Sequence, residues 1–281
     1  MDFKKKILVY EVIPPKGVNL EKCLDLCKRM VDAGADVVAI TDMPVGSARM
    51  APWAVAKFLI DEGVEPLVHF TRTSRNILRI ESDLLGMSAL GVRNLLLLSG
   101  DDPKVGDYPS ATRVEDISIN DLIRLVKLMN EGKDLAGNEL KGKTEFSAGA
   151  VFNPLLDWDI KRARGKVESG VDFLVSQPIF KKVEFPKLGV PVIMSVAFFK
   201  SEKQLRRFGS VPGIEIPKEF FRDLEGRDKD YVADYTFERV LEVVEAMFDE
   251  VSGFYVPGIV RDVERVGKLA NFIEDLSKKS I

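Results

Sequence analysis

Histidine and cysteine are scarce in this chain of 281 residues, which holds one histidine, His69, and two cysteines, Cys23 and Cys27. A single histidine excludes mechanisms that need two, and it disfavours hydrolysis at a multi-histidine metal centre. The cysteines stand four residues apart in a predicted helix, where a disulfide would strain the helix and a zinc site would lack ligands. We therefore expect two core thiols, no metal site and a reducing cytoplasmic compartment.

Several patterns with a defined chemistry are also missing. The chain has no Gly-x-Ser-x-Gly elbow, no P-loop and no Gly-x-Gly-x-x-Gly fingerprint after a predicted strand. It has no apolar run of about 18 residues and no signal-peptide pattern at its start, so we expect no membrane span. The formal net charge is −3, and no basic surface indicates nucleic-acid binding.

Strand-like and helix-like segments alternate along the chain. The predicted strands cover residues 7–12, 37–40, 66–70, 93–99, 146–152, 173–176, 190–197 and 252–256. The predicted helices cover residues 20–33, 51–62, 76–90, 119–129, 158–169 and 262–278, and several end at a glycine. Eight strands with intervening helices predict an α/β fold, a closed (β/α)8 TIM barrel that forms one domain over residues 1–281. An open doubly wound sheet is the alternative.

Three segments exceed this regular rhythm. Residues 101–118 and 130–144 are long loops around the fourth predicted helix, and loops of this length are usually functional or mobile. Residues 211–248 stand between the seventh and eighth strands. We expect them to carry extra helices at 217–224 and 237–248.

Polar residues recur where the predicted strands end. The most informative case is a run of four leucines that leads directly into Gly100 and Asp101. Because the carboxyl ends of barrel strands share one rim, we expect a set of polar side chains to meet there, namely Glu11, Thr41, Asp42, His69, Asp101, Asn153 and Gln177. Each one alone would be interpreted as a cap or turn residue. Their recurrence favours a functional site.

Glu11 is the sharpest candidate among them. It stands near the end of the first predicted strand, just before Pro14 and Pro15. Partial desolvation there would favour its protonated form, as suits a general acid. The alternative is a structural ion pair with a neighbouring lysine.

Six motifs resemble those of the methylenetetrahydrofolate reductases, a family of flavin-dependent α/β barrels. They occur in the family's order over nearly the whole chain: YEVIPPK at 10–16, AITD at 39–42, PLVHFT at 66–71, LLSGD at 97–101, GKVESG at 165–170 and VSQPIF at 175–180. Residues 43–50 and 104–109 are most similar to the branch that is fused to homocysteine methyltransferase domains.

The resemblance implies a role for each matching residue. Glu11 would protonate the folate so that its bridging methylene opens, and Asp101 would lie between flavin and pterin. The implied FAD contacts are Thr41, His69, Gly100, Asp101, Phe152, Asp159 and Lys166. The implied substrate contacts are Gln177, Phe199, Tyr255 and Arg261.

The resemblance also implies an activity, the reduction of 5,10-methylenetetrahydrofolate or a related tetrahydropterin to the 5-methyl form, in methionine biosynthesis. FAD would carry the hydride, and NAD(P)H or a reducing partner protein would supply it. The outer helices leave a homo-oligomer open.

Two positions depart from the family pattern. Ser99 stands where many members have arginine, and Phe152 followed by Asn153 stands where a tyrosine is common. These departures motivate an alternative, a partner-dependent pterin-binding subunit with weak or no activity alone. A third hypothesis keeps the barrel and assigns lyase or isomerase chemistry to its carboxylates.

Overall fold

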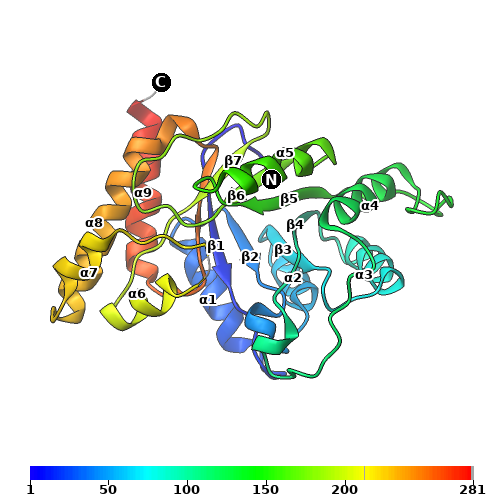
Figure 1. Cartoon of the computed structure of the whole chain (residues 1–281), viewed down its shortest axis with the longest axis horizontal. Helices are drawn as coiled ribbons and strands as arrows, with labels where there is room; N and C mark the ends of the chain where they lie inside the picture. Colours follow the sequence, from blue (N-terminus) through cyan, green and yellow to red (C-terminus); the bar gives the residue numbers. More distant parts are fainter. Residues whose placement is uncertain (212, 280–281) are drawn as a thin grey trace.

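Eight short apolar strands form the centre of the molecule. The structure is a computed structural model that describes residues 1–211 and 213–279. Each strand pairs in parallel with the next and the last pairs with the first, so the barrel is closed (Figure 1). The strands are β1 (Ile7–Val12), β2 (Val37–Ile40), β3 (Pro66–Thr71), β4 (Asn94–Leu98), β5 (Ser147–Phe152), β6 (Phe173–Ser176), β7 (Val192–Ser195) and β8 (Gly253–Val256). The predicted (β/α)8 barrel is confirmed, and the open sheet is wrong.

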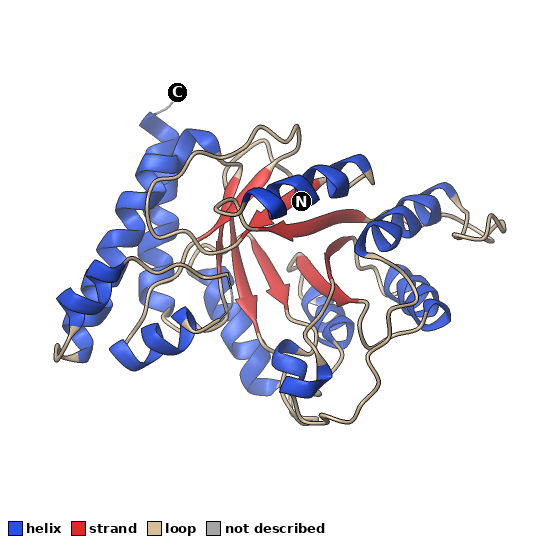
Figure 2. Cartoon of the chain, in the orientation of Figure 1, coloured by secondary structure: helices blue, strands red, loops and turns tan. Residues whose placement is uncertain are grey.

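Helices cover the outside of the strands (Figure 2). Six of them begin and end close to the predicted bounds, namely α1 (Glu21–Asp32), α2 (Pro52–Asp61), α3 (Ile77–Ala89), α4 (Ile119–Glu131), α5 (Asp157–Glu168) and α9 (Val263–Lys279). The last helix, α9, contacts α1 and so joins the two ends of the ring. None of the helices in the described part of the chain is long and apolar enough to span a membrane.

The segment between β7 and β8 is more helical than predicted. It contains α6 (Glu202–Gly209), α7 (Lys218–Leu224) and α8 (Lys229–Met247), followed by the 3-10 turn η3 (Phe248–Glu250). The predicted helix 217–224 is α7, whereas the predicted helix 237–248 is the second half of α8. Helix α6 was missed. Residue 212 of the predicted segment 211–248, and residues 280–281 at the end of the predicted domain, lie outside the described residues.

The connection from β6 to β7 follows a different plan. Residues 177–191 are all described, and they form a loop that contains no helix. The loop covers the outside of the barrel with Phe185, whose ring centroid lies 6.2 Å from that of Phe152 on β5. Phe185 and Leu188 belong to the main hydrophobic cluster, so the loop takes over the burial that a helix provides elsewhere.

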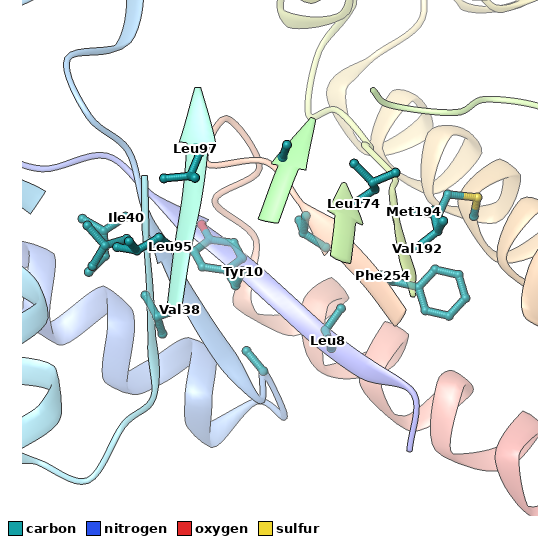
Figure 3. Close-up of a cluster of buried hydrophobic side chains, with 14 of the residues drawn as sticks. Leu8, Tyr10, Val38, Ile40, Leu95, Leu97, Leu174, Val192, Met194 and Phe254 are labelled. Atoms are coloured by element: carbon teal, nitrogen blue, oxygen red, sulfur yellow. The ribbon is translucent and has the colours of Figure 1, made fainter. Parts of the chain in front are cut away.

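The strands bury apolar side chains on both faces. Leu8 and Tyr10 on β1 point outward into the layer beneath the helices, where Figure 3 shows them in a cluster with residues of β2, β4, β6, β7 and β8. Ile7 and Val9 alternate with them and point into the barrel, where they pack in a separate cluster. The next residue of β1 to point inward is Glu11. The period of the strand therefore places a carboxylate directly above an apolar barrel interior.

Candidate active site

Glu11 lines a cavity of about 240 Å³ at the carboxyl end of the barrel. The lower wall is apolar and includes Leu98 on β4 and Val151 on β5. Four of the predicted site residues share the cavity, namely Glu11, His69, Gln177 and Tyr255. Each comes from the end of a different strand. Of the polar strand ends expected to meet on one rim, Glu11, His69 and Gln177 share this cavity, and Tyr255, a substrate contact implied by the resemblance, joins them.

A hydrogen-bonded chain links three of these four residues. The Tyr255 hydroxyl donates to Glu11 Oε2 at 2.5 Å, and it lies 3.0 Å from His69 Nε2. The backbone N–H of Gly258 donates to Glu11 Oε1 at 2.9 Å. A tyrosine hydroxyl carries one proton. Because that proton points to Glu11, the Nε2–H of His69 is the donor to Tyr255.

Burial keeps the other two members of this hydrogen-bonded chain, His69 and Tyr255, neutral. It lowers the pKa of His69 from its ordinary value of 6.5, and this effect outweighs the nearby carboxylates of Glu11 and Asp42. Burial also raises the pKa of Tyr255 well above 10, and Glu11 adds to the shift. Near pH 7 these three side chains therefore include a neutral imidazole and a neutral phenol.

Asp101 lies in a neighbouring cavity of about 230 Å³ rather than beside Glu11. Its exposed carboxylate accepts a hydrogen bond from the Val45 backbone N–H at 2.6 Å. Gly100 lines the same cavity with φ +90°, and a side chain there would approach Thr71 Cβ to 3.0 Å. The two predicted catalytic residues are thus on the same rim but in separate cavities.

Two rim loops are joined over the Asp101 cavity. We call them the latch, which comprises residues 43–49 with the turn η1 (Pro44–Gly46) and residues 101–108 with the turn η2 (Pro103–Val105). Asp107 holds the latch, since it accepts hydrogen bonds from Lys16 Nζ at 2.8 Å, Ser47 Oγ at 2.9 Å and Ala48 N at 3.0 Å. The bond from Lys16, followed by that from Ser47, lowers the pKa of Asp107.

Two residues of the latch have an unfavourable backbone conformation. Met43 and Val45 adopt φ of 48° and 57°, a left-handed conformation that is uncommon for a residue with a side chain and unusual for a β-branched one. Gly106 approaches the backbone of Gly46 so closely that an added Cβ would lie 1.9 Å from the Gly46 carbonyl oxygen. The hydrogen bonds to Asp101 and Asp107 stabilise this arrangement.

The other long loop flagged from the sequence lies away from both cavities. Residues 130–144 include a bridge between Lys133 and Glu139, and most of the segment is exposed. Asp42, a rim residue in the prediction, is buried and pairs with Arg75 at 2.7 Å while it accepts from Thr71. For Asp42, the structural interpretation is the better one.

The predicted FAD contacts are spread over a wider area. Thr41 is buried at the end of β2, and its hydroxyl has no hydrogen-bond partner among the described residues. Asp159 on α5 accepts from the Asn153 backbone at 2.7 Å. Lys166 is buried, which lowers its pKa, and its ammonium donates to the Val151 carbonyl at 2.6 Å.

Three further predicted contacts, like Thr41, Asp159 and Lys166, line neither cavity. The Phe152 side chain points outward to Phe185, because its neighbour Val151 takes the inward position on β5. Phe199 is buried behind Phe208, with ring centroids 5.3 Å apart, and Phe208 is the residue that lines the cavity. Arg261 is exposed beyond β8.

The sequence reasoning missed several wall residues. Ser176 and Ser195 end β6 and β7, and both line the Glu11 cavity. Phe208 on α6 and Ile214 close the cavity from the β7–β8 segment. The signal for α6 is Ser201, whose hydroxyl accepts from the Gln204 backbone N–H as an N-cap.

Comparison with known proteins adds independent information. The family model of methylenetetrahydrofolate reductase matches residues 1–261. A probable methylenetetrahydrofolate reductase (NADPH) of Caenorhabditis elegans is 24% identical over 268 residues, which cover 89% of this chain and 39% of that protein. Methylenetetrahydrofolate reductase 1 of Schizosaccharomyces pombe is 24% identical over 236 residues, which cover 79% of this chain and 38% of that protein. The chain thus spans less than half of the length of these relatives.

Many solved structures share the fold, and two of them bind or make related compounds by name. An uncharacterized protein from Clostridium thermocellum, which binds two copies of 5-methyl-5,6,7,8-tetrahydrofolic acid, has a TM-score of 0.65 and 14% identity, with 96% of each chain covered. The dihydropteroate synthase of Yersinia pestis has a TM-score of 0.51 and 12% identity, with 100% of this chain and 96% of that one covered. Because the family model covers all but the last part of the barrel, this chain belongs to the methylenetetrahydrofolate reductase family.

Proposed function

We propose that this chain reduces 5,10-methylenetetrahydrofolate, or a related tetrahydropterin, to the 5-methyl form. Glu11 would act as the general acid and FAD would carry the hydride. The observation that carries the proposal is the Glu11 carboxyl, which two hydrogen bonds hold at the mouth of a cavity with an apolar lower wall. The methyltetrahydrofolate bound by the Clostridium thermocellum protein is the same class of molecule as the proposed product.

The chemistry needs one proton and one hydride. The protonated Glu11 gives its proton to a bridge nitrogen of the folate, the bond from that nitrogen to the methylene carbon breaks, and the second nitrogen forms an iminium with the carbon. A bound flavin supplies the hydride that converts this carbon to a methyl group. Gln177 lies in the same cavity, where its amide can donate to and accept from the pterin ring.

The walls of the cavity support the role of Glu11 as the proton donor. Leu98, Val151 and Phe208 form an apolar surface beside Glu11. A low-dielectric surrounding strengthens each hydrogen bond that the polar groups make to the substrate. Asp101, which we assign to the boundary between flavin and pterin, would exchange its bond with the Val45 N–H for a bond to the ligand.

The barrel mouth fits the ring system of a flavin. The Thr41 hydroxyl is buried without a partner among the described residues, and such a group suits a polar edge of the ring. Gly100 lets the backbone approach the ligand closely. We assign Thr41, His69 and Gly100 to this ring. The Lys166 ammonium already bonds a carbonyl, so its role toward the pyrophosphate requires that bond to be given up.

A partner-dependent pterin-binding subunit is the second candidate. Ser99 in place of the usual arginine and the engaged Lys166 ammonium both favour it, because both reduce the positive charge available to the anionic part of FAD. Either function would serve one-carbon metabolism for methionine in the cytoplasm. The electron donor in the first case is NAD(P)H or a reducing partner protein.

An absorbance spectrum from about 300 to 550 nm, before and after addition of FAD, tests the proposal. We expect a flavin spectrum that bleaches with NAD(P)H and returns with methylenetetrahydrofolate. A protein that remains colourless after reconstitution would contradict the flavoenzyme and favour the partner-dependent subunit. A yellow protein that NAD(P)H cannot reduce, but that an artificial reductant can, would indicate a reducing partner.

A further inference from the structure

We infer that Tyr255 is a positioning residue of this site, whose hydroxyl fixes the carboxyl of Glu11 and couples it to the buried His69. The inference rests on the proposed function in one respect, the role of Glu11 as the acid. The juxtaposition of the three side chains does not depend on that role. It rests on two hydrogen bonds, from Tyr255 to Glu11 and from His69 to Tyr255.

The barrel register explains how the tyrosine reaches both partners. Strand β8 pairs with β1, and Tyr255 faces the barrel interior at the level of Val9, one inward position below Glu11. His69 is on β3, which β2 separates from β1. The residue of β2 opposite Glu11 is Ala39. Its methyl group is too small to fill the barrel mouth, and the Tyr255 ring spans the gap.

When the Glu11 carboxyl is ionised, the proton count of these three side chains leaves one arrangement. The single hydroxyl proton of Tyr255 points to Glu11, and the Tyr255 oxygen accepts from the Nε2–H of a neutral His69. With Gly258 N–H on the other oxygen, each carboxyl oxygen of Glu11 has one donor. Two donors on two oxygens fix the plane of the carboxyl group, so its remaining lone pairs have a defined direction.

Two carboxylates act on the buried imidazole. Glu11 on β1 and Asp42, two residues after β2, are the carboxylates that act on His69, and Asp42 is compensated by its ion pair with Arg75. Glu11 is the carboxylate that acts on Tyr255. A substitution at Tyr255 therefore changes the surroundings of Glu11 and His69 and leaves the ion pair of Asp42 in place.

The first readout is the His69 imidazole, and it needs neither cofactor nor substrate. His69 is the only histidine of the chain, so 15N-histidine labelling gives one pair of imidazole nitrogen signals. We expect the wild-type protein to show the Nε2–H tautomer near pH 7. In Tyr255→Phe this nitrogen loses its acceptor, and we expect a mixture of both tautomers. The wild-type spectrum alone tests the tautomer, so the result does not depend on the folding of a variant.

The second readout is the folate half-reaction of the FAD-loaded protein. For Tyr255→Phe we expect a loss of about 10- to 100-fold in its maximal rate, as for the loss of a hydrogen bond to a charged group. We also expect the alkaline limb of its pH profile to move to higher pH, because the carboxylate loses a donor. The rate of flavin reduction, measured separately, shows how far the changed hydrogen bonding of His69 affects the flavin.

Tyr10→Phe is the matched control. Tyr10 is also buried, also lies on an inner strand and donates its hydroxyl to the Val260 carbonyl at 2.5 Å, but it points into the outer layer. It should leave the imidazole signals and the pH profile unchanged. Identical imidazole signals in wild type and Tyr255→Phe would overturn the inference, as would an unchanged pH profile. Altered imidazole signals in a protein that fails to reduce folate would uphold the juxtaposition and refute the proposed function.

Discussion

At the scale of single residues, Glu11→Gln separates the two half-reactions. The variant cannot deliver a proton, so we expect folate reduction to fall by about 10²- to 10⁴-fold. Its side-chain oxygen can still accept from Gly258, and flavin reduction should remain near the wild-type rate. Stopped-flow measurement of each half-reaction checks the prediction. Glu145→Gln, which changes an exposed carboxylate paired with Arg93, is the control. Equal loss of both steps in Glu11→Gln would refute the general-acid role.

His69 should make the fold sensitive to mild acid. Its pKa is lowered in the folded protein but lies near 6.5 in the unfolded chain, so below that pH the unfolded state binds more protons. The free energy of unfolding is therefore expected to fall as the pH drops from about 6.5 toward the lowered value. Urea unfolding at about pH 7.5 and about pH 5.5 measures this change. His69→Gln should show a smaller change, and an identical change in both proteins would contradict the prediction.

Strand periodicity determines the direction of several of the predicted site residues. Glu11, His69 and Tyr255 point into the cavity because each is an inward position of its strand. The same rule could have excluded Phe152 in favour of Val151. For Arg261 and Phe199, which follow β8 and β7, no periodic pattern gives the direction, and the packing of α6 determines where Phe199 lies.

At the scale of elements, the latch should depend on Asp107. Asp107→Asn removes the charge that attracts Lys16 and replaces one acceptor oxygen with a donor, so the two loops should separate more often. Limited trypsin digestion after Lys104 and Arg113 reports this opening. We expect cleavage to be several-fold faster than in the wild type.

Asp134→Asn provides the matched comparison. Asp134 is another exposed loop aspartate whose pKa is lowered by hydrogen bonds, in this case first from Asn138. It lies in the 130–144 segment, outside the latch. Cleavage at Lys104 and Arg113 should be unchanged by this substitution. Equal protection in the Asp107 variant would show that backbone packing at Gly46 and Gly106 is sufficient to hold the latch.

Elements were predicted accurately where one βα unit follows another. Apolar runs and helix-ending glycines gave all eight strands and the six regular helices. The β7–β8 segment was the exception. Helix α6 has only eight residues, most of them polar, and one fully buried side chain, Leu205, so its apolar residues are too few to mark a helix and the cap at Ser201 is the clearest signal. The first half of α8 is rich in charged residues and was missed because few apolar residues mark its core face.

At the scale of the whole molecule, the barrel interior is packed so tightly that one added methyl group would clash with a neighbouring ring. A Cβ added at Gly149 on β5 would lie 2.2 Å from the ring of Phe173 on β6. We expect Gly149→Ala to lower the free energy of unfolding by about 1–3 kcal/mol. Gly86→Ala, on the exposed face of α3 with open space around it, should raise it by about 0.5–1 kcal/mol. Urea unfolding compares them, and a Gly149→Ala protein as stable as the wild type would show that the barrel can expand.

The hydrogen bond between Glu11 and Tyr255 joins residues that are 244 positions apart in the chain. Tyr255 lies in the last strand, and Gly258, the second donor to Glu11, follows it. A nascent or truncated chain that lacks β8 therefore has the acid but neither of its donors. Contacts at such a separation in sequence form late, because closing a long loop costs entropy before the contact stabilises it. The proposed general acid is thus organised in the same step that closes the barrel, and an incompletely folded chain lacks this arrangement.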